Sequence, residues 1–192
     1  MDKDIIIFKT AQLIKKYGIK SLTIDDTASF LVVSKSALYK YFNTKDELIK
    51  MSLEFINKDF ETKINLLFLK KENPIKKLID IYYFTIDFLI EFDDVFFFDL
   101  KKSPNSHEII SEYKNNFKLK FVLPLLNQAE KSGYLISNIN IEEALNSYFE
   151  FINYYFINFK TDNSLIKKQI VIYLNKYLTE EHKKDYNYLL LE

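Results

Sequence analysis

The segment that most constrains the fold of this 192-residue chain is residues 23–42. Its sequence is Thr-Ile-Asp-Asp-Thr-Ala-Ser-Phe-Leu-Val-Val-Ser-Lys-Ser-Ala-Leu-Tyr-Lys-Tyr-Phe. Thr23 and Ser34 are residue types that favour the N-cap position of a helix. Two aspartates follow Thr23 closely, where negative charge complements the helix dipole. We therefore predict two short helices, 24–31 and 34–42, joined by a tight turn.

Composition favours helices throughout the chain. Only two glycines and three prolines are present, too few for the many turns of an all-β fold. The absence of cysteine excludes disulfides and thiolate metal sites. No apolar run is long enough to span a bilayer, and residues 5–8 are too short for the core of a signal peptide. We predict an all-α protein located in the cytoplasm.

Apolar residues at helical spacing predict the remaining elements. An N-terminal three-helix head is expected to join a helical bundle through a long helix that begins near Lys45. We place the domains at 1–47 and 48–192. The further expected helices are 3–17, which Gly18 ends, 45–70, 74–92, 106–132 with an interruption or kink at Pro124, 141–160 and 164–178.

Two short helices joined by a tight turn are the layout of a helix-turn-helix, whose second helix enters the major groove of DNA. Residues 1–50 hold nine lysines and six acidic residues, a net charge of +3, and the rest of the chain carries −3. A basic head on an acidic body fits a DNA-reading module attached to a domain with another task. Because all 27 basic residues are lysines, a bidentate arginine contact to guanine is excluded.

The chemistry of the two helices suggests individual contacts with DNA. Thr23 and Ser34 place hydroxyls and free backbone N–H groups at helix N-termini, where anions bind. Candidates for contacts with base edges follow in the second helix, where alanine suits a thymine methyl group and lysine suits guanine. These candidates are Lys35, Ser36, Ala37 and Lys40. For Thr23 and Ser34 the alternative is a purely structural role as caps.

From Ile6 to Leu48 the chain resembles the tetracycline-repressor (TetR) family of bacterial transcription regulators. The resemblance rests on Ile6-Ile7, Leu13-Ile14, Gly18, Thr23, Ala28, Val33-Ser34, Leu38-Tyr39, Tyr41-Phe42 and Lys45-Asp46-Glu47-Leu48, without a gap. It implies that Tyr39, Tyr41 and Lys45 bind DNA phosphates, although Tyr39 could instead be a core aromatic residue.

The turn departs from the pattern of this family. Thr27 stands where the family has isoleucine, and Leu31-Val32 where Ala-Gly is usual. The family's glycine caps the helix with a positive φ, which is costly for a β-branched residue. We therefore predict a negative φ at Val32 and a turn that differs from the family norm.

The resemblance also implies that the chain forms a homodimer through two C-terminal helices, here 141–160 and 164–178. Long aromatic and aliphatic stripes on these helices suit a four-helix bundle with a partner, although such stripes are also typical of ordinary core. The expected interface residues are Leu145, Phe149, Ile152, Phe156, Phe159, Ile166, Ile170, Leu174 and Tyr177.

A pocket for a small-molecule effector in the body is a further implication of the resemblance. The resemblance assigns 1–47 to DNA binding and 48–192 to effector binding and dimerisation. Aromatic walls with a few polar groups are typical of ligand pockets, but the same stripes are more often core. The candidates are Phe84, Asp87, Phe88, Glu91, Phe92, Phe96, Tyr113, Phe117, Phe121 and Tyr155.

Catalysis has little support in the sequence. His107 and His182 are isolated, and the chain has no glycine-rich phosphate loop or metal-spaced cluster. We expect no enzyme, no catalytic residue, no metal and no cofactor. The function expected is a homodimeric repressor that a small molecule releases from a palindromic operator in double-stranded DNA. The alternative is a helical regulator with weakened DNA specificity, which acts through protein partners or by sequestering a ligand.

Overall fold

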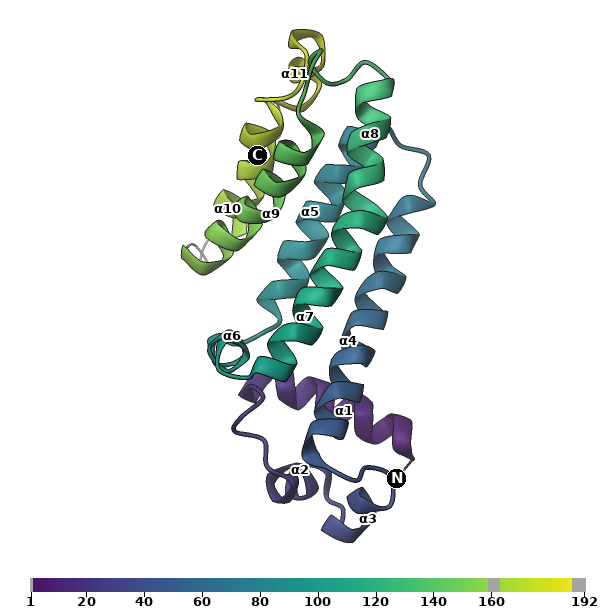
Figure 1. The fold of residues 1–192 in the computed structure, drawn as a ribbon, viewed down its shortest axis with the longest axis vertical. Helices are drawn as coiled ribbons and strands as arrows, with labels where there is room; N and C mark the ends of the chain where they lie inside the picture. The colour runs from purple at the N-terminus through teal and green to yellow at the C-terminus, as the bar shows by residue number, and fades with distance from the viewer. Residues whose placement is uncertain (1, 159–162, 188–192) are drawn as a thin grey trace. The chain divides into compact units, whose positions relative to one another are not determined.

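A computed structural model describes residues 2–158 and 163–187, without the side chains of 151–158, 163 and 164. Within these ranges the secondary structure is helical and contains no strand, which confirms the all-α prediction. The helices are α1 (Lys3–Tyr17), α2 (Ile24–Leu31), α3 (Lys35–Tyr39), α4 (Lys45–Phe68), α5 (Pro74–Ile90), α6 (Asp94–Lys101), α7 (Pro104–Phe117), the π-helix η1 (Lys118–Val122), α8 (Leu123–Lys131), α9 (Ile141–Asn158), α10 (Asn163–Leu174) and α11 (Glu180–Tyr186) (Figure 1).

The chain packs into two compact units. The first comprises residues 1–63 and 91–114, and the second comprises residues 64–90 and 115–192. Helix α4 begins in the first unit and ends in the second, as the predicted connecting helix would. The division of function between residues 47 and 48 stays a prediction, because packing does not measure function.

The first unit has its own apolar core under the helix-turn-helix. Figure 1 shows α1, α2 and α3 gathered around the first turns of α4. Each buried aliphatic or aromatic side chain contributes about 1.5–3 kcal/mol relative to its exposed state, so this cluster holds the short helices together. Its members are Ile6, Ile7, Ile24, Ala28, Leu31, Leu38, Phe42 and Leu48.

Thr27 does not leave a polar defect in this core. The side chain is buried, and its hydroxyl donates to the Thr23 carbonyl at 2.8 Å. A buried hydroxyl costs free energy mainly when it has no partner, and this one is satisfied within its own helix. Threonine in place of the family's isoleucine is therefore accommodated at this position.

The end of α1 is fastened to α6 within the first unit. Gly18 ends α1 with φ 79°, and its N–H donates to the Ile14 carbonyl at 3.0 Å. The N–H of Asp93 donates to the Lys15 carbonyl at 2.9 Å. The buried carboxylate of Asp99 accepts from the Lys20 N–H at 2.8 Å, so polar groups of α6 and the residue before it satisfy the backbone around the α1 terminus.

The second unit is built on α5, which packs on α8, α9 and α10. Tyrosines anchor its core by donating to backbone carbonyls: Tyr82 to Ile166 at 3.2 Å and Tyr148 to Leu78 at 3.3 Å. Burial raises the pKa of the Tyr148 hydroxyl well above its ordinary value. Within this unit α9 and α10 lie side by side (Figure 1).

The interruption predicted at Pro124 lies earlier in the chain. The helix passes through the π-helical segment η1 and resumes as α8, where proline is the second residue. Pro124 has no N–H to donate to the carbonyl four residues earlier, at Lys120, which lies within the π-helical segment. The predicted interruption is therefore present, and its irregular backbone precedes the proline.

Candidate nucleic-acid interface

The N-terminus of α2 is closed by a reciprocal capping box. The Thr23 hydroxyl oxygen accepts from the Asp26 N–H at 3.0 Å, and the Asp26 carboxylate accepts from the Thr23 N–H at 3.3 Å and from its hydroxyl at 2.6 Å. These hydrogen bonds to the charged form lower the pKa of Asp26, with the Thr23 hydroxyl as the largest cause. The predicted N-cap role of Thr23 is confirmed.

The prediction of a negative φ at Val32 is wrong. Val32 has φ 56° and ψ 46°, in the left-handed region. In this conformation its N–H donates to Ser29 at 3.1 Å and the Val33 N–H donates to Ala28 at 3.0 Å. These bonds satisfy carbonyls at the end of α2 that would otherwise lack partners. The turn keeps this hydrogen-bonded geometry although valine pays a steric cost for it.

Helix α3 begins at the predicted cap and ends earlier than predicted. The Ser34 hydroxyl oxygen accepts from the Ala37 N–H at 3.1 Å, which confirms Ser34 as an N-cap. The helix stops at Tyr39 rather than at Phe42, because the next residues continue in turns. Leu38 is fully buried, so this side of the short helix faces the core.

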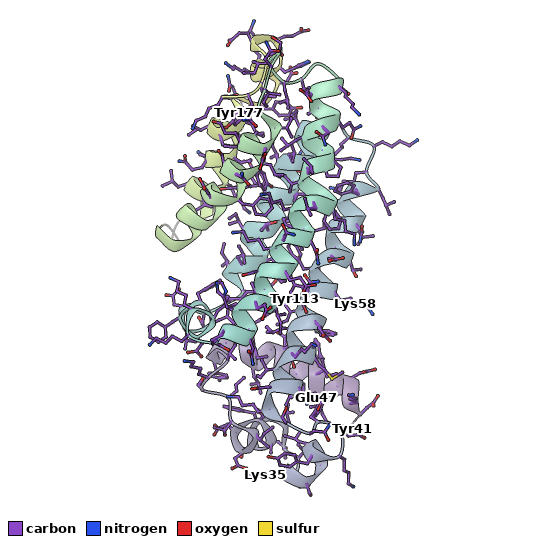
Figure 2. The ribbon with its side chains drawn as sticks, in the orientation of Figure 1. Lys35, Tyr41, Glu47, Lys58, Tyr113 and Tyr177 are labelled. Carbon is purple, nitrogen blue, oxygen red and sulfur yellow. The ribbon has the colours of Figure 1, made fainter. Side chains whose placement is uncertain are left out.

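Most of the predicted DNA contacts are exposed in the first unit. Tyr39 and Tyr41 remain 48% and 39% exposed. The alternative that Tyr39 is a core aromatic residue therefore has no support. Lys35 and Tyr41 both lie at the α2–α3 end of this unit (Figure 2). Ala37 and Lys45 are half-buried. The exposed residues of the predicted set are Thr23, Ser34, Lys35, Ser36, Tyr39, Lys40 and Tyr41.

Two of the predicted lysines have partners within the unit. The Lys45 ammonium donates to the Lys20 carbonyl at 3.2 Å. The Lys35 ammonium lies 2.9 Å from one carboxylate oxygen of Asp25 and 3.1 Å from the other. Asp25 raises the pKa of Lys35, chiefly by accepting this hydrogen bond. The pairing across the two helices was not predicted, because no periodicity relates residues ten positions apart.

The predicted effector-binding residues fall into both compact units. In the first unit the tilted rings of Phe92 and Phe96 are in contact, with centroids 4.6 Å apart, and the Glu91 carboxylate pairs with Lys15 at 2.6 Å. In the second, Asp87 pairs with Lys167 at 2.7 Å. Phe84 and Tyr113 are half-buried, Phe88, Phe117 and Phe121 are buried, and Tyr155 lies outside the described side chains.

A groove of about 520 Å³ lies in the first unit. The loop after α1, the first turns of α4 and the start of α7 line it, with Lys20 and Lys45 in its wall. None of the predicted effector-binding residues lines this groove.

The predicted dimer residues that the structure describes are mostly buried within the single chain. Leu145, Phe149, Ile166, Ile170 and Leu174 are buried, and Tyr177 is half-buried. Ile152, Phe156 and Phe159 lie outside the described side chains. Exposed apolar residues on α10 are Leu165 and Ile172.

The described part of the chain contains neither a membrane-spanning helix nor a metal-binding cluster. There, no helix combines the length and the apolar character that crossing a bilayer requires. The same residues include no group of three or more histidine, cysteine or acidic side chains placed to hold a metal ion.

Comparisons with known proteins place this geometry in a family. A sequence model described as "Bacterial regulatory proteins, tetR family" matches residues 6–51, which include most of α1, all of α2 and α3, and the start of α4. Residues 6–51 therefore carry the sequence pattern of the TetR family. The members of this family are transcriptional regulators and not enzymes, in agreement with the sequence-based expectation. A comparison with curated protein sequences found no match.

Solved structures share the whole TetR-family fold at low sequence identity. A TetR transcription regulator from Haloarcula marismortui ATCC 43049 is 16% identical, with a TM-score of 0.78 over 92% of this chain and 97% of that one. A TetR-family regulator from Marinobacter aquaeolei VT8 is 17% identical, with a TM-score of 0.77 over 100% and 98%. AibR in complex with isovaleryl coenzyme A and operator DNA is 17% identical, with a TM-score of 0.67 over 88% and 96%.

Proposed function

We propose that this TetR-family regulator is a homodimeric repressor that acts in the cytoplasm and leaves a palindromic operator when a small molecule binds. The observation that carries the proposal is the exposed polar surface of α3 above a buried core. Such a surface offers hydroxyls, lysines and two tyrosines to the major groove and its phosphates.

The contacts that we propose divide by their chemistry. Thr23 and Ser34 contact phosphates at helix N-termini, where anions bind. Tyr39, Tyr41 and Lys45 contact further phosphates, and together these contacts set the register of the protein on DNA. Base edges are read by side chains of α3 and of the residue that follows it, namely Lys35, Ser36, Ala37 and Lys40.

Dimerisation and effector binding complete the proposal. A single head reads too few bases, whereas two heads in a symmetric dimer reach half-sites about one helical turn apart or more. Since Ile166 and Ile170 are buried within the chain, we assign the dimer contact to outward residues such as Leu165 and Ile172. AibR, which is bound to isovaleryl coenzyme A and operator DNA, supports a small-molecule effector for this fold.

Selection of binding sequences from a random palindromic DNA library tests the proposal. The protein should select one sequence, and Tyr41→Ala and Lys45→Ala should weaken binding to it. Lys63→Ala is the matched control, because Lys63 pairs with Asp59 on α4, outside the proposed contacts. Binding without sequence preference, unchanged in all variants, would favour the alternative of a regulator that acts through protein partners or by sequestering a ligand. Compounds that release the selected DNA then identify the effector.

A further inference from the structure

The ion pair between Asp25 and Lys35 links the two helices of the helix-turn-helix on their solvent side. Asp25 is the second residue of α2, and Lys35 is the first residue of α3. The side chains are 69% and 52% exposed, and the ammonium lies 2.9 Å from the nearer carboxylate oxygen. The pair therefore adds little to the core, yet it stands at the start of the helix that we assign to the major groove.

A lysine without such a partner would be a poor reader of sequence. Its ammonium is a compact charge on a flexible stem, and the nearest acceptors on a duplex are phosphate oxygens. Contacts with phosphates are independent of sequence and weaken with salt. A carboxylate beside the ammonium changes this preference, because a phosphate repels the carboxylate while it attracts the lysine.

The major-groove edge of a G·C base pair matches both members of the ion pair. Guanine presents the acceptors O6 and N7, and cytosine presents the N4 amino donor beside them. Lysine donates to guanine, and aspartate accepts from cytosine. An ammonium and a carboxylate in contact thus present a donor and an acceptor side by side. Phosphates offer acceptors alone, so they match only the ammonium.

We propose that Asp25 is a specificity-determining residue, which holds Lys35 for one G·C base pair in each half-site and accepts a hydrogen bond from the cytosine of that pair. This inference rests on the proposed DNA-binding function. It assigns Asp25 a role that the adjacent Asp26 does not share, because the carboxylate of Asp26 is occupied by the capping box with Thr23.

The substitution Asp25→Asn tests the role, because it removes the charge and keeps the size of the side chain. Asp59→Asn is the matched control: Asp59 also pairs with a lysine, Lys63, at 2.7 Å on the surface of the same unit. Residue 59 is 14 positions beyond the first residue of α4, about 21 Å along the helix, which exceeds the screening length of about 10 Å at 0.1 M salt.

The readouts are the affinity for the selected sequence, the affinity for a scrambled duplex, and the dependence of each on salt. Asp25→Asn should bind the scrambled duplex more tightly and lower the ratio of specific to non-specific affinity about ten-fold. For the scrambled duplex, the slope of log affinity against log salt should steepen by about one, because Lys35 becomes free to bind a phosphate. Asp59→Asn should leave the ratio and the slope at their wild-type values.

A second readout locates the effect on the DNA. Each base pair of the selected half-site is replaced in turn, and wild type should lose about ten-fold in affinity at one G·C pair that Asp25→Asn no longer distinguishes. In the Lys35→Gln background, Asp25→Asn should have a smaller effect than in wild type, because only the contact with cytosine is then left to lose.

The possible failures are distinct. In one outcome, wild type selects a sequence, but folded Asp25→Asn has the same base-pair profile and the same ratio of specific to non-specific affinity. That outcome overturns this inference and leaves the proposed function intact. Equal effects of Asp25→Asn and Asp59→Asn also overturn it, because they indicate general charge. Binding of all duplexes alike by wild type overturns both proposals.

Discussion

At the scale of single residues, Val32 holds a conformation that its side chain disfavours. The φ of 56° places a β-branched residue in the left-handed region, and the side chain is 89% exposed, so packing does not compensate for the steric cost. We expect Val32→Gly to raise the free energy of unfolding by about 1 kcal/mol, net of the greater entropy of glycine in the unfolded chain. Urea denaturation measures the change, with Val32→Ala as the control that retains a Cβ. Destabilisation by glycine would contradict the left-handed turn.

Glycine at position 18 is required both by its positive φ and by the lack of space for a side chain. A Cβ at Gly18 would lie 2.5 Å from a carboxylate oxygen of Asp99, whereas a Cβ at Gly133 would meet nothing within 4 Å. The φ values are similar, 79° and 75°. Gly133→Ala therefore measures the cost of the left-handed backbone, about 1–2 kcal/mol.

Gly18→Ala should cost about 2 kcal/mol more than Gly133→Ala, because the buried Asp99 must move away from the backbone N–H that it accepts from. The two glycine variants are compared by urea denaturation under the same conditions. Equal losses of unfolding free energy in the two variants would contradict the close contact between Gly18 and Asp99.

At the scale of elements, the start of α2 depends on the capping box. Thr23→Ala should lower the free energy of unfolding by about 1 kcal/mol, and Thr23→Ser should restore most of the loss, because serine keeps the accepting hydroxyl. Thermal denaturation followed by circular dichroism distinguishes the variants. If alanine and serine behave alike, the hydroxyl does not cap the helix.

The same cap predicts a dependence on pH. Because the folded protein lowers the pKa of Asp26 below its ordinary value of 3.8, this carboxylate stabilises the fold above pH 3.8 and loses that effect as the pH falls through its folded value. Asp26→Asn should therefore be less stable than wild type at neutral pH, with a difference that shrinks in acid. A difference that persists at low pH would exclude this cause.

Local chemistry predicted helix ends better than it predicted contacts between elements. Asp25 and Lys35 come into contact only because the turn folds α3 back beside α2. The spacing of residues within one helix does not predict such a contact. The steric cost of a β-branched residue predicts a negative φ at Val32, but the hydrogen bonds of the turn outweigh that cost. Apolar stripes by themselves do not separate surface from core: Ile166 and Ile170, which lie on the stripe predicted to meet a partner, are buried within the single chain.

At the scale of the whole molecule, buried tyrosines make the fold sensitive to alkali. Burial raises the pKa of Tyr113 from 10.0 to about 12, and burial also raises the pKa values of Tyr148 and Tyr173. Between pH 10 and 12 the folded state retains a proton that the unfolded state has released, so stability should fall as the pH rises. Denaturation at several pH values should show this fall, with a smaller slope in Tyr113→Phe. An unchanged slope in that variant would contradict the burial of its hydroxyl.

The central claim is that the surface of α2 and α3 binds a specific DNA sequence. Its most direct test is the equilibrium affinity of the protein for the selected duplex and for a scrambled one, measured over a range of salt concentrations. The account predicts at least about a 10³-fold preference for the selected duplex and a steep loss of affinity with salt. Lys45→Ala should reduce the salt slope by about one, while Lys63→Ala leaves it unchanged. Equal affinity for the two duplexes, or the same slope in wild type and Lys45→Ala, would contradict the account.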